Sequence, residues 1–170
     1  MRALTAFVAA LVVVLLLRST ALSAFASRGI VLDALAFATV VWSLRHGPAW
    51  GASFGFALGI AADLDAAHWL GRHALVLTLL GYAIGRLAST LVRESARTQF
   101  ALLIAATLIH QTWCALFELT SWSASPYLAL RTVLSTVASA AIGTLLLAVA
   151  RRLAGGPLFG NVSIQPGQTR

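Results

Sequence analysis

The sequence predicts an all-α membrane protein in which about six transmembrane helices pack as one compact bundle. Its 170 residues are 59% hydrophobic and only 10% charged, and the mean hydropathy is +0.88. A soluble domain of this size could not bury so much apolar surface in one core, whereas a lipid bilayer accepts it. The apolar residues also fall into six stretches separated by short polar segments. These stretches are 3–25, 30–44, 49–62, 74–92, 100–119 and 127–150.

The first stretch resembles a secretory signal peptide but is expected to remain on the protein as a helix. Arg2, an apolar run and the sequence Ala24-Phe25-Ala26 imitate the three regions of such a signal. Arg18 interrupts the apolar run, however, and further apolar stretches follow it rather than a secreted domain. We therefore predict an uncleaved first helix.

The second and third stretches, at roughly 15 residues each, fall short of the about 20 residues that a helix needs to cross a bilayer. The fourth, fifth and sixth stretches meet that length. Residues 45–48 (Arg-His-Gly-Pro) join the short pair in a tight turn, because proline stops a helix. The pair either crosses with local thinning of the bilayer or enters and returns as a re-entrant hairpin. Both alternatives leave the sidedness of the later stretches unchanged.

The distribution of arginine predicts that both termini are cytoplasmic. All basic residues are arginines, and an inside N-terminus places most of them at cytoplasmic ends, as the positive-inside rule requires. The inner set is Arg2, Arg45, Arg86, Arg93, Arg97, Arg151, Arg152 and Arg170, and the outer set is Arg18, Arg28, Arg72 and Arg131. Aromatic residues agree with this orientation, since such residues favour the interfaces. Trp69 and Trp122 fit the outer interface, and Trp42 and Trp50 fit the inner one.

The chain is predicted to hold one domain. Residues 1–152 form the transmembrane domain, and residues 153–170, which are polar and punctuated by glycine and proline, form a flexible cytoplasmic tail. The formal charge of +7 does not indicate nucleic-acid binding, because the arginines are scattered between apolar runs and form no basic stripe. The single cysteine, Cys114, excludes an internal disulfide, and we interpret it as a small apolar residue within a span.

Three aspartates stand at the ends of the second and third stretches. Asp33 lies near the outer end of the second stretch, where it caps that helix or pairs with Arg28 or Arg72. Asp63 and Asp65 follow the third stretch and are close enough to disfavour joint ionisation. Two interpretations of this pair stay open: the acids cap helix ends, or they provide a functional polar feature.

The sequence gives no positive case for an enzyme, a cofactor or a metal site. No metalloprotease motif, paired cysteines or glycine-rich phosphate loop is present. His68 and His73 are five residues apart, which does not place them on one helix face as ligands. His110 lies within the fifth stretch, where polar side chains usually bond between helices. We expect no catalytic residue and no metal.

A ladder of glycines crosses the third stretch. Gly51, Gly55 and Gly59 recur every four residues and share one helix face, and Asp63 is the next step along it. Absent side chains allow another helix to approach closely. Gly81 and Gly85 form a second pair of the same spacing, which could face the first ladder. The ladder either packs within this chain or forms a docking groove for the transmembrane helix of a partner.

The motifs between residues 30 and 85 resemble, in order and spacing, those of the rod shape-determining protein MreD family. They are Asp33-Ala34-Leu35; Gly51, Gly55-Phe56, Gly59 and Asp63; Gly71-Arg72-His73-Ala74-Leu75; and Leu80-Gly81-Tyr82. The family pattern has an acid before the second helix, a G-F-x-x-G segment leading to an aspartate in the third, and G-x-x-A-L leading to a tyrosine in the fourth. This chain has Leu32 where the family often has proline.

The resemblance, which covers most of residues 1–152, implies a non-catalytic scaffold of the bacterial elongation machinery in the inner membrane. Members of the family are associated with MreC and indirectly with MreB, RodA and a penicillin-binding transpeptidase, and they support lateral peptidoglycan synthesis and rod shape. The expected contacts are between helices and with surrounding lipid. The residues expected to pack helices or bind a partner are Gly51, Gly55, Gly59, Asp63, Gly71, Gly81, Tyr82 and Gly85, with Asp33, Asp65 and His110 as further polar groups.

The resemblance also carries an alternative. The family is similar in fold to the substrate-binding subunits of energy-coupling-factor transporters. A small-molecule transport subunit with a pocket near Pro48 and Asp63 is therefore the second hypothesis. A transporter should place more polar groups at mid-membrane, whereas most charges here lie at the ends of the apolar stretches, which favours the scaffold.

Overall fold

The computed structural model describes residues 2–22, 32–66, 70–118, 125–156 and 158–159. Within these ranges all regular structure is helical, as the sequence predicts. The helices are α1 (Arg2–Leu17), the short π-helix η1 (Arg18–Leu22), α3 (Ala34–His46), α4 (Pro48–Ala66), α5 (Arg72–Leu87), α6 (Ala96–Glu118) and α7 (Ser125–Ala154). The signal-like segment Ala24–Ala26 and the tryptophans at 69 and 122 lie outside the described residues.

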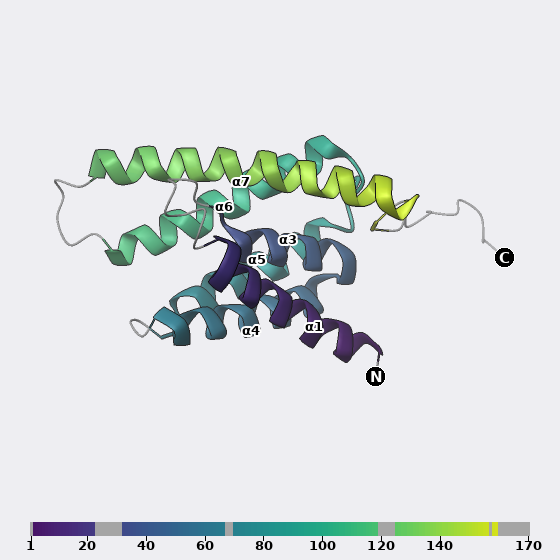
Figure 1. Cartoon of the computed structure of the whole chain (residues 1–170), viewed down its shortest axis with the longest axis horizontal. Helices are drawn as coiled ribbons and strands as arrows, with labels where there is room; N and C mark the ends of the chain where they lie inside the picture. The colour runs from purple at the N-terminus through teal and green to yellow at the C-terminus, as the bar shows by residue number, and fades with distance from the viewer. Residues whose placement is uncertain (1, 23–31, 67–69, 119–124, 157, 160–170) are drawn as a thin grey trace.

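Helix α3 is the centre of the fold. It contacts α1, α4, α5, α6 and α7, and residues such as Val40 and Leu44 on it are fully buried. Helices α4 and α5 pack side by side on one side of α3, and the α6–α7 pair lies on the other (Figure 1). Thr39 and Ser43 are small polar residues that are buried in this central helix. Their hydroxyls are satisfied there, because each donates to a carbonyl of the preceding turn. The shortest α-helix is therefore also the most enclosed.

The turn between α3 and α4 follows directly from its sequence. Gly47 ends α3 with a positive φ of 83°, a conformation that favours glycine, and its N–H donates to the carbonyl of Ser43. Pro48 is the first residue of α4, where its fixed φ suits a helix and its missing N–H costs nothing. The tight turn predicted at residues 45–48 is confirmed.

The helix lengths differ from those predicted. α4 has 19 residues and is longer than expected, whereas α5 has 16 and ends at Leu87 rather than near residue 92. α5 ends early because the hydroxyls of Ser89 and Thr90 bond back to the carbonyls of its last turn. Within the part of the chain that the structure describes, two helices are long and apolar enough to cross a membrane, at Ala96–Phe117 and Thr132–Ala154, and Leu4–Thr20 is a shorter apolar helix.

The outer surface is apolar in the way that a lipid environment permits. Large hydrophobic side chains are more than half exposed along α1, α5, α6 and α7. Examples are Leu4, Leu16, Leu79, Leu116, Leu134 and Leu145. Isolated exposed leucines are ordinary in soluble proteins, but apolar residues along so many helices indicate a membrane.

The ends of α3, α6 and α7 meet around Glu94 and Arg93. Glu94 forms an ion pair with Arg151 at 3.3 Å and accepts the backbone N–H of Phe159 at 2.7 Å. Arg93 donates to the carbonyls of Ala88 and Leu44. The predicted tail begins at residue 153, but residues 153 and 154 belong to α7 and Phe159 is buried. Part of the predicted tail therefore still packs on the helices.

Candidate functional site

The glycine ladder lies in the interface between α4 and α5. A Cβ atom added at Gly55 would fall less than 3 Å from the backbone of Leu77, and one at Gly59 would fall equally close to the backbone of Ala74. Gly51 lies against the carbonyl of Gly81 in the same way. These distances leave no space for a side chain, so the two helices touch through their backbones.

The second glycine pair faces the first across this interface. A Cβ at Gly81 would meet the carbonyl of Gly51, and one at Gly85 would meet Pro48 at the start of α4. Tyr82, in contrast, lies on the outer side of α5 and is 51% exposed. Both glycine sets therefore make their contacts within this chain, and Tyr82 is left on the surface.

Asp63, at the end of the ladder, caps α5. Its Oδ2 accepts the backbone N–H groups of Gly71 and Ala74, at 2.9 and 3.1 Å. Its Oδ1 accepts both the backbone N–H and the ring Nδ1–H of His73, at 3.0 and 2.8 Å. Gly71 permits this approach with a φ of 97° at the N-cap of α5. The carboxylate is fully buried, and four donors satisfy it.

Asp33 caps the start of α3 in the same way as Asp63 caps α5. Its Oδ1 accepts the N–H of Ala36, and its Oδ2 accepts the ring Nδ1–H of His110 at 2.6 Å. The backbone N–H of Asp33 donates to the hydroxyl of Ser139 on α7 at 2.9 Å. Gln111 adds a longer contact of 3.4 Å. Asp33 is thus both a helix cap and a bond between three helices.

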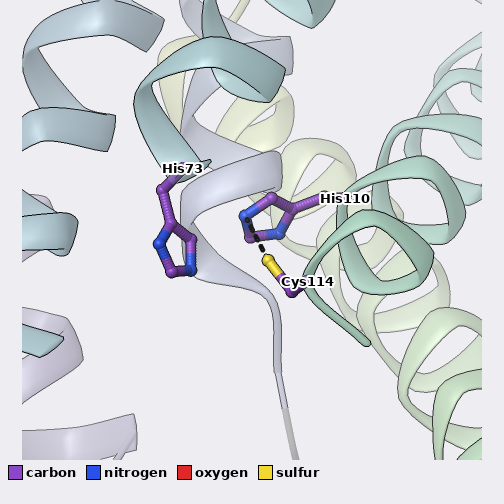
Figure 2. A group of neighbouring side chains, drawn as sticks. All are labelled: His73, His110 and Cys114. Atoms are coloured by element: carbon purple, nitrogen blue, oxygen red, sulfur yellow. Dashed lines mark hydrogen bonds between the residues drawn. The ribbon is translucent and has the colours of Figure 1, made fainter. Parts of the chain in front are cut away.

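The two histidines held by these aspartates face one another beside Cys114. The ring centroids of His73 and His110 are 5.4 Å apart, and Cys114 Sγ lies 3.8 Å from Nε2 of His110 (Figure 2). One ligand atom from each of the three residues lies within 4.8 Å of the others. Both histidines are buried, and Cys114 is partly buried. We call these three residues the His–His–Cys cluster.

Asp65 does not join this cluster. Its side chain is 75% exposed and lies 3.8 Å from the Arg18 guanidinium. Asp63 and Asp65 are only two residues apart, but their environments differ. Asp63 is enclosed at the α4–α5 connection, and Asp65 stands on the surface beside η1.

Sequence reasoning placed Asp33, Asp63 and His110 among the candidates but missed His73, Cys114 and Ser139 as their neighbours. His73 was compared with His68, which lies outside the described residues, rather than with a residue of another helix. One signal was available: His110 and Cys114 are four residues apart and hence on one face of α6.

The fold and the site define a helical membrane protein with an apolar exterior and a buried polar junction. Residues 1–148 of the chain match the family of the rod shape-determining protein MreD. The chain therefore belongs to this family. The match confirms the resemblance read from the sequence and gives the chain a role in rod shape determination. No curated protein and no solved structure matches the chain significantly.

Proposed function

We propose that this chain is a non-catalytic scaffold of the bacterial elongation complex, spanning the inner membrane with about six helices and both termini in the cytoplasm. In this proposal it holds the transmembrane helix of an MreC-like partner and, through it, supports MreB, RodA and the penicillin-binding transpeptidase. A bundle of the energy-coupling-factor type is part of the same proposal. The family match supports the rod-shape role.

The single observation that favours a scaffold over a transporter is the use of Asp63. A substrate subunit should aim its buried polar groups into a pocket. Both oxygens of Asp63 instead accept bonds from the start of α5. The residue that the transporter hypothesis would assign to a ligand is therefore engaged in holding helices together.

The partner surface proposed here is a groove between α1 and α3, because the glycine ladder is used within the chain. This α1–α3 groove has a volume of about 270 Å³ and is lined by apolar side chains that include Ala10, Val14, Phe37 and Trp42. A smaller cavity of about 120 Å³ continues it toward Gly143 and Leu146 of α7. An apolar helix fits such a surface, because close van der Waals packing drives association in lipid.

The test compares neighbouring alanines of α1. Ala10 lines the groove, whereas Ala9 is exposed beside it. Ala10→Leu should lower recovery of the MreC-like partner and round the cells at a normal protein level, and Ala9→Leu should do neither. Equal partner recovery from both variants would remove the α1–α3 groove as the docking face.

Depletion tests the scaffold itself. Cells depleted of the protein should lose rod shape while a purified polymerase keeps its activity. Failure to take up a nutrient with normal cell shape would instead support the transport hypothesis. Reporter fusions at Arg170 should show a cytoplasmic C-terminus.

A further inference from the structure

We propose that His73, His110 and Cys114 form a binding site for a thiophilic transition-metal ion, and that Zn²⁺ is the ion whose chemistry fits best. Imidazole nitrogen and thiolate sulfur are the ligands that Zn²⁺ prefers, and three protein ligands leave one coordination position for water or an outside group. The proposal is independent of the scaffold function and stands on the geometry of three side chains from two helices, α5 and α6.

The distances suit a metal centre. With metal–nitrogen and metal–sulfur bonds of about 2.0–2.3 Å, ligand atoms around a tetrahedral Zn²⁺ lie about 3.4–3.8 Å apart. Cys114 Sγ and His110 Nε2 are already 3.8 Å apart, and the whole set lies within 4.8 Å. Small side-chain movements would therefore close the site without moving a helix.

Two carboxylates orient the histidines as they do in established metal sites. Each carboxylate accepts a bond from Nδ1, at 2.8 Å in the Asp63–His73 pair and at 2.6 Å in the Asp33–His110 pair. An ionised carboxylate only accepts, so Nδ1 of each ring carries a proton, and Nε2 is the nitrogen that a neutral ring offers to a metal ion. Figure 2 shows one nitrogen of each ring turned toward the space beside the sulfur. Carboxylate–histidine–metal chains of this kind fix the ring and raise its basicity as a ligand.

The site joins α5 to α6. His73 is the second residue of α5, and His110 and Cys114 lie on one face of α6. Asp63 extends the same chain of contacts to α4, and Asp33 extends it to α3. A bound ion would clamp the α6–α7 pair to the rest of the bundle. Binding releases the Cys114 thiol proton to solvent, since the thiolate is the ligand.

Cobalt substitution tests this proposal with little ambiguity. The full chain is purified in detergent with an affinity tag free of histidine, treated with a chelator and titrated with Co²⁺. Because Cys114 is the only cysteine, a thiolate-to-cobalt charge-transfer band can arise from this residue alone. We expect the band to saturate at about one ion per chain and to vanish when Zn²⁺ displaces Co²⁺.

Two variants complete the experiment. Cys114→Ala should abolish the band and weaken Co²⁺ binding by about tenfold or more, since one of three ligands is lost. His46→Ala is the matched control, because His46 is exposed and stacks on Trp42 away from the cluster. It should bind as the wild type does.

Wild-type protein that shows no charge-transfer band with stoichiometric Co²⁺ overturns the proposal without relying on any variant. An unchanged affinity in Cys114→Ala would do the same, since the ion would then be bound elsewhere. A second readout is alkylation of Cys114, which Zn²⁺ should slow by about tenfold or more if the sulfur is a ligand. An alkylation rate that is independent of Zn²⁺ contradicts the site.

Discussion

Helices α4 and α5 are joined by backbone contact, whereas the α6–α7 pair is joined to the rest of the bundle by apolar core side chains and a few buried polar ones. In the first interface, Gly51, Gly55 and Gly59 leave no side chain at three points where the helices approach closely. At the second, the Asp33–His110 bond and the His–His–Cys cluster carry much of the specific contact. The first interface is a close backbone contact along two helices, and the polar part of the second is concentrated at a few atoms. Steric change should therefore damage the first most, and a change of hydrogen bonding should damage the second.

Gly55→Leu should have the largest effect. Its Cβ alone would collide with the backbone of Leu77, so the helices must separate along their length. We expect a loss of about 3 kcal/mol, at the upper end of the range for overpacking. Thermal unfolding in detergent and the level of protein in cells measure it. Ser53→Leu is the control, because Ser53 is exposed on the same helix. A stable Gly55→Leu protein that loses only its partner would show that this face is used in binding after all.

Asp63→Asn should have an intermediate effect. The carboxylate accepts four bonds through two oxygens, and the amide nitrogen that replaces one oxygen cannot accept the N–H groups directed at it. The expected cost is about 1–3 kcal/mol, the usual penalty for buried groups left unsatisfied. The same thermal assay measures it. Wild-type stability would show that the capping bonds contribute little to the start of α5.

Asp65→Asn should have the smallest effect and serves as the matched comparison for Asp63→Asn. The carboxylate is mostly exposed, and its pair with Arg18 is long at 3.8 Å. Surface ion pairs contribute about 0–1 kcal/mol, so the unfolding temperature should hardly change. A loss equal to that of Asp63→Asn would indicate that Asp65 has a role that the structure does not show, such as contact with a partner.

The contrast between the two interfaces also explains which parts could be predicted. A glycine ladder is a local periodic pattern, so close packing of its helix can be predicted from the spacing of glycines within that one helix. The same spacing made Gly81 and Gly85 a second pair that could face the first ladder. Asp63 as a cap was one of two open interpretations, because an acid at a helix end has a local explanation.

The His–His–Cys cluster could not be predicted because its members come from different helices. His73 and His110 are 37 positions apart in the sequence, and no spacing rule links them. Each has an ordinary explanation alone: His73 begins a helix, His110 bonds between helices, and Cys114 is small. Only the tertiary fold shows that both rings are held by aspartates and share a thiol neighbour. The sequence-based expectation of no metal site rested on local motifs, which this arrangement lacks.

The helices also differ in length enough to affect the surrounding bilayer. At 1.5 Å per residue, α3 and α5 measure about 20 and 24 Å, while α6 and α7 measure about 34 and 45 Å. A hydrocarbon core of about 30 Å lies between these values. A bilayer whose hydrocarbon thickness equals the length of α5 is thinner than one whose thickness equals the length of α6. The two sides of the molecule therefore suit bilayers of different thickness, unless the longer helices tilt. If these helices span the membrane, such a molecule would impose a gradient of thickness on its lipid and would favour short-span neighbours beside α5.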